Sequence, residues 1–287
     1  MGQIEIPLQI APYARRDRQA VRELLFRSPF THTHLDWHDT DDWLDGGEGV
    51  VRLAWRDEYL VGLLAVSESL SSTAWVRLAA VQNHVDQAAV LGALWTNVQP
   101  ELLELGVRRV SLLIIRDWIE PIAAQLGFRH TDDIVTLRRS SAALPDFKMP
   151  DGLTIRPTEL EDLPTIARVD HAAFAPPWQL SLRELRQADR ISASCTVAVR
   201  DGQIIGYQLT TLYFDGAHLA RLAVQPAEQG GGIGAALVYD LLARFWRRQV
   251  HSITVNTQAS NTRSQRLYTR LGFHHNGFNL PVWTADL

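Results

Sequence analysis

The same order of strand-like and helix-like hydrophobic patterns occurs twice in this 287-residue chain, at an offset of roughly 145 residues. Two short matches fix the alignment: RLAAVQ at 77–82 corresponds to ARLAVQ at 220–225, and LGF occurs at both 126–128 and 271–273. A duplication restricts the chain to two copies of one fold, each long enough to bury its own core.

Strand-like alternation and helical spacing of apolar residues give the same elements in both copies. The second copy predicts strands at 153–158, 195–200, 204–214, 217–224, 252–256 and from 273 onward, and helices at 160–174, 180–188, 232–249 and 261–271. The fainter first copy predicts strands at 4–10, 50–55, 60–67, 75–81 and 109–115, and helices at 15–26, 86–105 and 118–126. The pattern indicates an α/β (α+β) fold in which each domain is a mixed, mostly antiparallel sheet flanked by helices.

A polar, proline-containing stretch without periodicity separates the two copies. It predicts a first domain at 1–140, a linker at 141–152 and a second domain at 153–287.

Composition excludes several classes of protein. The net charge of −4 and the pI of about 6.2 do not favour a nucleic-acid binder. The single cysteine, Cys195, permits no internal disulfide and no cysteine-rich zinc site, which fits a reducing cytoplasm. The sequence shows no signal peptide and no apolar run of about 18 residues. We therefore expect a cytoplasmic protein that binds neither nucleic acid nor a membrane.

The segment LAVQPAEQGGGIGA at 222–235 carries the strongest chemical signal. A strand ends, and a glycine-rich turn opens a long helix whose free N–H groups would bind a phosphate or diphosphate. A P-loop is excluded because Gly234 is followed by two alanines. A dinucleotide fingerprint fits poorly, since residues 225–229 separate the strand from the first glycine and the next strand ends in Asn256, which is not acidic.

Gln229, Gly232 and Gly234 resemble the Gln/Arg-x-x-Gly-x-Gly/Ala motif with which the GNAT superfamily of N-acetyltransferases binds acyl-CoA. The resemblance continues in Asn261 and in LYTRLGF at 267–273. It implies acetyl-CoA as the co-substrate. The two-domain organisation is similar to that of tandem family members such as mycothiol synthase.

The resemblance also implies residue roles. Backbone groups of one strand would pair with the pantetheine arm, with one N–H polarising the thioester carbonyl, and the loop would cradle the diphosphate. The cofactor-binding residues are then Leu222, Ala223, Val224, Gln229, Gly230, Gly231, Gly232, Ile233, Gly234, Ala235 and Asn261. Tyr268 would be the general acid that protonates the departing thiolate.

Phe174, Pro177 and Trp178 resemble the substrate loop of the ribosomal-protein alanine acetyltransferases, one branch of this family. Phe174 and Trp178 are therefore candidates for the acceptor pocket, although packing between two helices would explain them equally well.

The general base is less clear, because the positions at which the family places a glutamate hold Asn256 in one case and Ala220 and Arg221 in the other. His218 is the candidate base, with Asp170 and His171 as alternatives.

The first copy lacks these features. Its loop at 81–89 contains no glycine, and Ala123 stands at the position of the tyrosine, so we expect it neither to bind acetyl-CoA well nor to catalyse. The run HTHLDWH at 32–38 comes close to a dizinc motif, but Trp37 interrupts it. We interpret this run as a substrate-contacting or solvated loop and expect no metal.

The sequence thus predicts an N-acetyltransferase whose C-terminal domain transfers an acetyl group to a primary amine by direct attack in a ternary complex. Cys195 lies far in sequence from both motifs, so no covalent intermediate is expected. The acceptor is a small-molecule amine or a peptide N-terminus, and a homodimer is possible. The alternative is a non-catalytic protein that binds or senses acyl-CoA.

Overall fold

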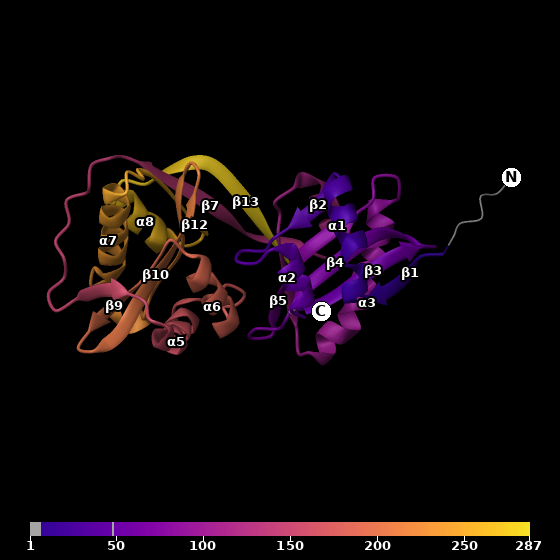
Figure 1. Ribbon diagram of the computed structural model, residues 1–287, viewed down its shortest axis with the longest axis horizontal. Helices are drawn as coiled ribbons and strands as arrows, with labels where there is room; N and C mark the ends of the chain where they lie inside the picture. Colours follow the sequence, from indigo (N-terminus) through magenta and orange to yellow (C-terminus); the bar gives the residue numbers. More distant parts are fainter. Residues whose placement is uncertain (1–6, 48) are drawn as a thin grey trace. The chain divides into compact units, whose positions relative to one another are not determined.

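The computed structural model describes residues 7–47 and 49–287. Its contacts divide the chain into an N-terminal unit, Met1–Asp132 with Leu280–Leu287, and a C-terminal unit, Asp133–Asn279 (Figure 1).

The C-terminal unit is built on a sheet with strands in the order β8-β9-β10-β11-β12-β7. Its elements are β8 (Thr154–Pro157), α5 (Leu163–Ala173), α6 (Leu182–Ile191), β9 (Ser194–Arg200), β10 (Gln203–Tyr213), β11 (Gly216–Val224), α7 (Ile233–Arg247), β12 (Ser252–Gln258), α8 (Thr262–Arg270) and part of β7 (Arg129–Ser140). Only the β11–β12 pair is parallel within this described sheet. Helices α7 and α8 lie together on one face, and α5 and α6 on the other (Figure 1).

The main core of the C-terminal unit lies between the sheet and the helices α7 and α8. Leu241 and Phe245 of α7 pack with Leu219 of β11 and with Tyr268 of α8. The regular apolar face of α7 therefore fixes where the helix begins relative to the end of β11.

The N-terminal unit repeats the architecture, with strands in the order β1-β3-β4-β5-β6-β13. Its elements are β1 (Gln9–Pro12), α1 (Arg18–Arg27), β2 (Phe30–Thr33), α2 (Thr40–Asp45), β3 (Gly49–Arg56), β4 (Tyr59–Ser67), β5 (Thr73–Val81), α3 (Gln87–Glu104), β6 (Arg109–Leu113), a 3-10 turn (Asp117–Ile119), α4 (Glu120–Gln125) and part of β13 (His274–Asp286). An additional short strand, β2, pairs with β5.

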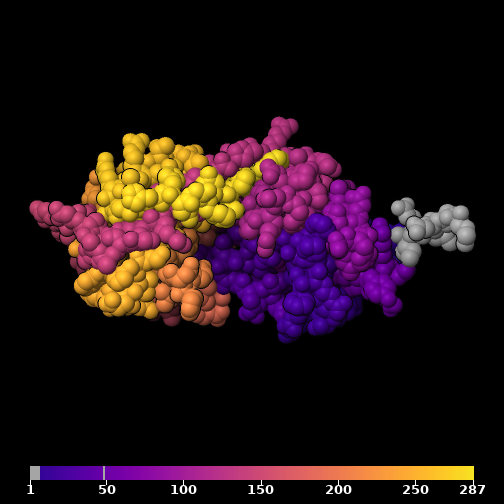
Figure 2. Space-filling model, turned by 90° about the horizontal axis from the view of Figure 1, so that it is seen from above, coloured from indigo at the N-terminus to yellow at the C-terminus, as the bar shows by residue number. Residues whose placement is uncertain are grey.

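The last strand of each sheet comes from the other half of the sequence. Residues 282–286 of β13 pair with β6 in the N-terminal unit, and residues 134–140 of β7 pair with β12 in the C-terminal unit. In the space-filling view, most yellow atoms belong to the C-terminal unit, and a small yellow area lies beside magenta atoms of the first half of the sequence (Figure 2). The boundaries of the compact units therefore differ from the predicted boundaries at 140 and 153, and the stretch 141–152 lies inside the C-terminal unit.

The predicted fold class is confirmed, because each unit is a mixed, mostly antiparallel sheet flanked by helices. Most expected elements lie within a few residues of their predicted bounds, although residues 4–6 of the first strand lie outside the described part of the chain. The prediction missed three elements, β2, α2 and β7. The longest of them, β7, immediately precedes the expected linker.

Candidate functional site

One edge of β11 is open beside the glycine loop. Its pairing with β12 covers Ala217–Leu219 and stops there in the described residues, whereas its pairing with β10 continues to Val224. The Gln225 amide donates to the Ile205 carbonyl at 2.8 Å. Since amide direction alternates along a strand, the N–H groups of Leu222 and Val224 point away from β10, toward the side that β12 has left. An extended ligand could pair with them there.

A β-bulge marks the place where β12 leaves. Leu209 lies opposite Arg221 and Thr210 lies opposite Leu219, so Ala220 is the extra residue. The bulge changes which face the following side chains occupy. Leu219 and Leu222 both pack toward α7, whereas Arg221 contacts α5.

The glycine loop leaves the start of α7 without a side-chain cap. Gly230 and Gly232 have φ angles of 93° and 82°, which side chains other than glycine rarely adopt. Gly232 is the N-cap of α7 and provides no side-chain cap, so the first-turn amides from Ile233 to Ala235 have no acceptor within the helix. Gly234 is constrained by packing, because a Cβ there would lie 3.2 Å from Leu267. This geometry fits a bound diphosphate.

Gln229 fixes one side of the loop, and Asn261 caps the helix α8. The Gln229 side-chain amide donates to the Val224 carbonyl at 2.9 Å and accepts from Arg263 at 2.6 Å. Asn261 caps α8, with its Oδ1 accepting from the Ser264 amide at 3.1 Å.

Tyr268 of α8 lies in the main core with 4% of its surface exposed. Its ring contacts Phe273, with 5.8 Å between centroids. Burial raises the pKa of the Tyr268 phenol above its ordinary value of 10.0, so the hydroxyl keeps its proton at neutral pH. The protonated phenol cannot act as a base, and the raised pKa also makes it a weaker acid than an exposed tyrosine.

On the opposite face of the sheet, Asp170, Tyr207 and Arg221 form a network that we call the buried triad. The fully buried Asp170 carboxylate accepts from the Tyr207 hydroxyl at 2.6 Å, from Arg221 at 2.7 and 2.8 Å and from the Leu180 amide at 2.9 Å. Burial, followed by the Asp170 charge, raises the pKa of Tyr207 well above its ordinary value. A carboxylate that accepts from four donors has no lone pair left for an incoming amine proton. Asp170 is therefore a structural residue and not the general base.

The loop that contains Phe174 and Trp178 packs against this triad. The Arg221 guanidinium lies 3.7 Å from the centroid of the Phe174 ring and also donates to the Trp178 carbonyl. The two aromatic residues are therefore held beside β11 near its bulge.

The two histidine candidates lie apart. The His171 Nε2 lies 2.8 Å from the Leu180 carbonyl, so its ring is engaged in the same loop. His218 lies on β11 ahead of the bulge, with its Nδ1 2.9 Å from the Thr254 hydroxyl. Of the two, only His218 belongs to the strand that carries the open edge.

The corresponding edge in the N-terminal unit is covered. Pairing of β5 with β6 spans Thr73–Trp75, and β2 then pairs with Leu78–Val81, which the alignment places opposite 221–224. The Trp118 indole donates to the Thr31 carbonyl at 3.1 Å and so holds β2 from the other side. Asp86 caps α3, with its carboxylate accepting from the Ala89 amide. An anionic side chain thus occupies the place where the C-terminal unit has glycine.

The interpretation of 32–38 as a loop is wrong at its start, because His32 lies in β2 with 1% of its surface exposed. Within residues 7–47 and 49–287, no three His, Cys, Asp or Glu side chains come close enough to hold a metal ion. Across the same described ranges, no helix is both long and apolar enough to cross a membrane.

Cys195 accepts a hydrogen bond from the Thr158 hydroxyl at 3.1 Å. Burial raises the pKa of its thiol to about 12, so a nucleophilic thiolate does not form near neutral pH.

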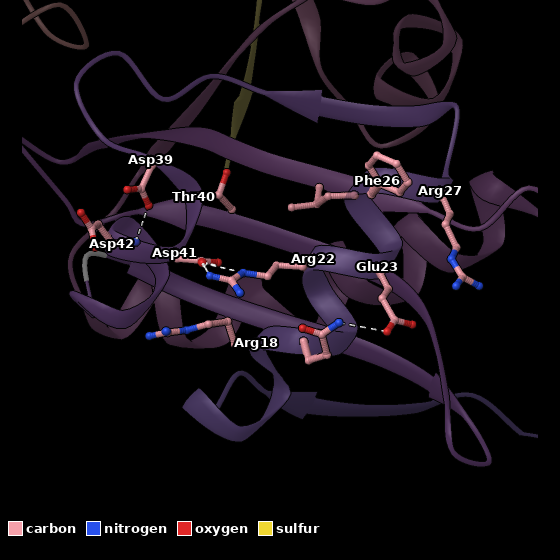
Figure 3. Close-up of a pocket in the computed structure, with 11 residues that line it drawn as sticks. Arg18, Arg22, Glu23, Phe26, Arg27, Asp39, Thr40, Asp41 and Asp42 are labelled. Atoms are coloured by element: carbon pink, nitrogen blue, oxygen red, sulfur yellow. Dashed lines mark hydrogen bonds and ion pairs between the residues drawn. The ribbon is translucent and has the colours of Figure 1, made fainter.

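A separate open hollow of about 980 Å³ lies between α1 and α2 of the N-terminal unit (Figure 3). Arg22 pairs with Asp41 across it, and Asp39 caps α2 through the Asp42 amide. It contains none of the residues for which the sequence predicts chemistry.

Sequence reasoning missed Arg263 and the structural role of Asp170. Arg263 had a usable signal, since it follows Asn261 within the first turn of a predicted helix. Asp170 and Arg221 are 51 residues apart, and no local pattern links them.

Comparisons with known proteins agree with this geometry. The acetyltransferase (GNAT) family model matches residues 162–273, a range that contains the glycine loop, Asn261 and Tyr268. A ribosomal protein bS18 alanine N-acetyltransferase of Escherichia coli K12 is 30% identical over 122 residues, which cover 42% of this chain and 80% of that protein.

A mycothiol acetyltransferase of Actinosynnema mirum is 28% identical over 183 residues, covering 60% of this chain and 59% of that protein. The match therefore spans less than two thirds of that relative's own length. Among solved structures, a tandem GNAT protein from the clavulanic acid biosynthesis pathway aligns with a TM-score of 0.65 and 16% identity, covering 98% of both chains. At this identity the likeness shows the fold alone.

Proposed function

Since this chain belongs to the GNAT family of acetyltransferases, we propose that its C-terminal unit transfers an acetyl group from acetyl-CoA to a primary amine. The amine attacks directly while both substrates are bound. The observation that carries the proposal is the contrast between two equivalent strands. The edge of β11 is open beside a glycine loop, whereas β2 covers the edge of β5.

Acetyl-CoA, when bound, supplies the thioester that gives up its acetyl group. The outward amides of Leu222 and Val224, on either side of Ala223, bind the pantetheine arm as an added strand, and one amide polarises the thioester carbonyl. Residues 230–235 cradle the diphosphate, Gln229 fixes the loop against Val224, and Asn261 contacts the cofactor from α8.

Tyr268 and His218 move the protons in this proposal. The buried phenol of Tyr268 keeps its proton and gives it to the departing sulfur. His218 takes the proton of the acceptor amine, directly or through a water molecule. Because burial keeps the Cys195 thiol protonated, the proposed route passes through no acetylated Cys195.

The acceptor reaches β11 from the side of the loop that contains Phe174 and Trp178, which the guanidinium of Arg221 holds in place. A small-molecule amine or a peptide N-terminus is the proposed acceptor class. One relative is named for a small molecule, mycothiol, and another for an alanine of a ribosomal protein. A cytoplasmic location and a homodimer are further proposals, and sedimentation velocity tests the second.

Calorimetric titration of the full chain with acetyl-CoA tests the proposal without knowledge of the acceptor. We expect one equivalent per chain, bound by the C-terminal unit. Two equivalents would mean that β2 does not exclude acetyl-CoA from the edge of β5, and absence of binding at millimolar ligand would refute the proposal.

A non-catalytic acyl-CoA sensor is the second candidate, favoured by the lack of a glutamate at 220, 221 and 256. The variants Tyr268→Phe and His218→Gln separate the two. For an enzyme, each should lower kcat about 100-fold against a panel of amines while leaving the Kd of acetyl-CoA within about twofold. A sensor would show no turnover in the wild type, and unchanged kcat in a variant would remove that residue from the mechanism.

A further inference from the structure

Arg263 reaches the glycine loop from a different element. Its Nη1 donates to the Gln229 Oε1 at 2.6 Å, and the other end of that amide is fixed, because Nε2 donates to the Val224 carbonyl. The guanidinium is thus held from α8 at a defined position beside the loop.

The Arg263 guanidinium lies next to Gly230 of the loop. A Cβ at Gly230 would lie 3.6 Å from the Arg263 Nη2, in ordinary contact. Within the described residues, the Arg263 guanidinium hydrogen-bonds through Nη1, and the side chain is exposed. The remaining donors of the guanidinium fork therefore face the loop and solvent.

The glycine loop itself contains no positively charged side chain. Between Gln225 and Ala235 the one charged residue is Glu228, which pairs with Arg200 at 2.8 Å. The uncapped start of α7 supplies only a partial positive charge, of about half a unit. A diphosphate carries two full negative charges, so a planar donor fork at this position matches what the loop lacks.

Resting on the proposed function above, we propose that Arg263 binds the diphosphate of coenzyme A and is a determinant of coenzyme affinity. Gln229 orients the guanidinium, and α7 binds the same group through its amides. The coenzyme diphosphate is thereby held between two helices, α7 and α8.

The helix offers a matched control. Arg270 lies two turns further along α8, where it lines an outer hollow with Thr269 and His275. Arg263→Gln and Arg270→Gln remove the same charge from the same helix, and both replace an exposed side chain. Equal circular dichroism spectra and unfolding midpoints would show that both variants fold.

Calorimetry with coenzyme A and with dephospho-coenzyme A, which lacks the 3′-phosphate but keeps the diphosphate, tests the proposal on the full-length protein. We expect Arg263→Gln to weaken both ligands by about tenfold or more, with a smaller effect in high salt, and Arg270→Gln to change neither by more than about twofold.

Each other outcome has a distinct meaning. If the loss on Arg263→Gln disappears with dephospho-coenzyme A, the residue binds the 3′-phosphate and the diphosphate assignment is wrong. An equal loss of coenzyme affinity in both variants would mean that only the overall charge of α8 matters, and it would overturn the proposal. If the wild type binds neither ligand, the proposed function itself fails, whatever the variants do.

Discussion

At the scale of single residues, Asp170 is the carboxylate at the centre of the buried triad. It is fully buried and surrounded by donors from Tyr207, Arg221 and the Leu180 backbone. A buried ion pair of this kind adds little net stability compared with apolar residues, but removing one partner leaves an uncompensated charge. The role of this ion pair is to hold α5, β10, β11 and the loop that contains Phe174 and Trp178 in fixed positions.

We therefore predict that Asp170→Ala lowers the free energy of unfolding by about 3–5 kcal/mol, measured by urea denaturation. Asp240→Ala, which breaks the surface pair with Arg244 on α7, should cost about 1 kcal/mol or less. The double variant Asp170→Leu/Arg221→Met should recover much of the loss, because both charges are removed. An Asp170→Ala variant as stable as the wild type would contradict this account.

The residues that could be predicted are those with local signals. Gln229, the glycines, Asn261 and Tyr268 stand at fixed spacings in one stretch of chain, and the structure places them around one loop and one helix. The buried triad could not be predicted, because its members come from three elements and their pairing depends on tertiary packing.

At the scale of elements, the two units differ most in what lies beside the strand that precedes the long helix. In the C-terminal unit the strand edge is open and the helix starts with uncapped amides. In the N-terminal unit β2 fills the edge, and Asp86 caps the helix. The short polar sequence FTHT gave no strand signal, since a four-residue strand is recognised by its partner rather than by its own pattern.

Placing an acidic residue in the glycine loop should reproduce the N-terminal situation. Gly231 has room for a side chain, since the nearest atom to its Cβ would be the Glu228 carbonyl at 3.5 Å. We predict that Gly231→Asp weakens acetyl-CoA binding by about tenfold or more through repulsion of the diphosphate. Gly231→Asn, the uncharged control, should bind more tightly than the aspartate variant, and equal calorimetric Kd values for the two would refute the electrostatic cause.

We expect His32 to make the stability of the N-terminal unit sensitive to acid. Burial, with the nearby charges of His34 and Arg77, lowers the pKa of His32 to about 3. The unfolded chain takes up a proton near the ordinary value of 6.5, whereas the folded chain resists it. Stability from this group is therefore complete above about pH 6.5 and falls by up to about 1.4 kcal/mol per pH unit below it.

We predict that His32→Leu flattens the decline of the unfolding free energy between pH 7 and pH 4, measured by urea denaturation at each pH. His84→Leu, a change at an exposed histidine, should leave the slope as in the wild type. Identical slopes in the wild type and in His32→Leu would assign the acid sensitivity to other groups.

At the scale of the whole molecule, the exchanged strands determine which fragments can fold. The repeat correctly predicted two copies of one fold, but not that each copy completes its sheet with residues from the other half. Sequence similarity shows that β7 and β13 are equivalent strands. It does not show which of them pairs with β6 and which with β12, because both would fit the same register.

We predict that the fragment Asp133–Asn279, which contains every strand of the C-terminal unit, folds and binds acetyl-CoA with the affinity of the full chain. The fragment 153–287 lacks residues 134–140, so β12 has an unpaired edge and this fragment should aggregate or stay unfolded. Circular dichroism and calorimetry on the two fragments check this. Folding and binding by the shorter fragment alone would show that β13 can replace β7.

The exchange of strands also bears on how the protein is made. A ribosome produces residues 109–113 of β6 long before residues 282–286 of β13, their partner strand. The N-terminal unit is synthesised first, but the edge of β6 stays unpaired until the second half of the chain has emerged. In this chain the order of synthesis is the reverse of the order in which the two units can be completed.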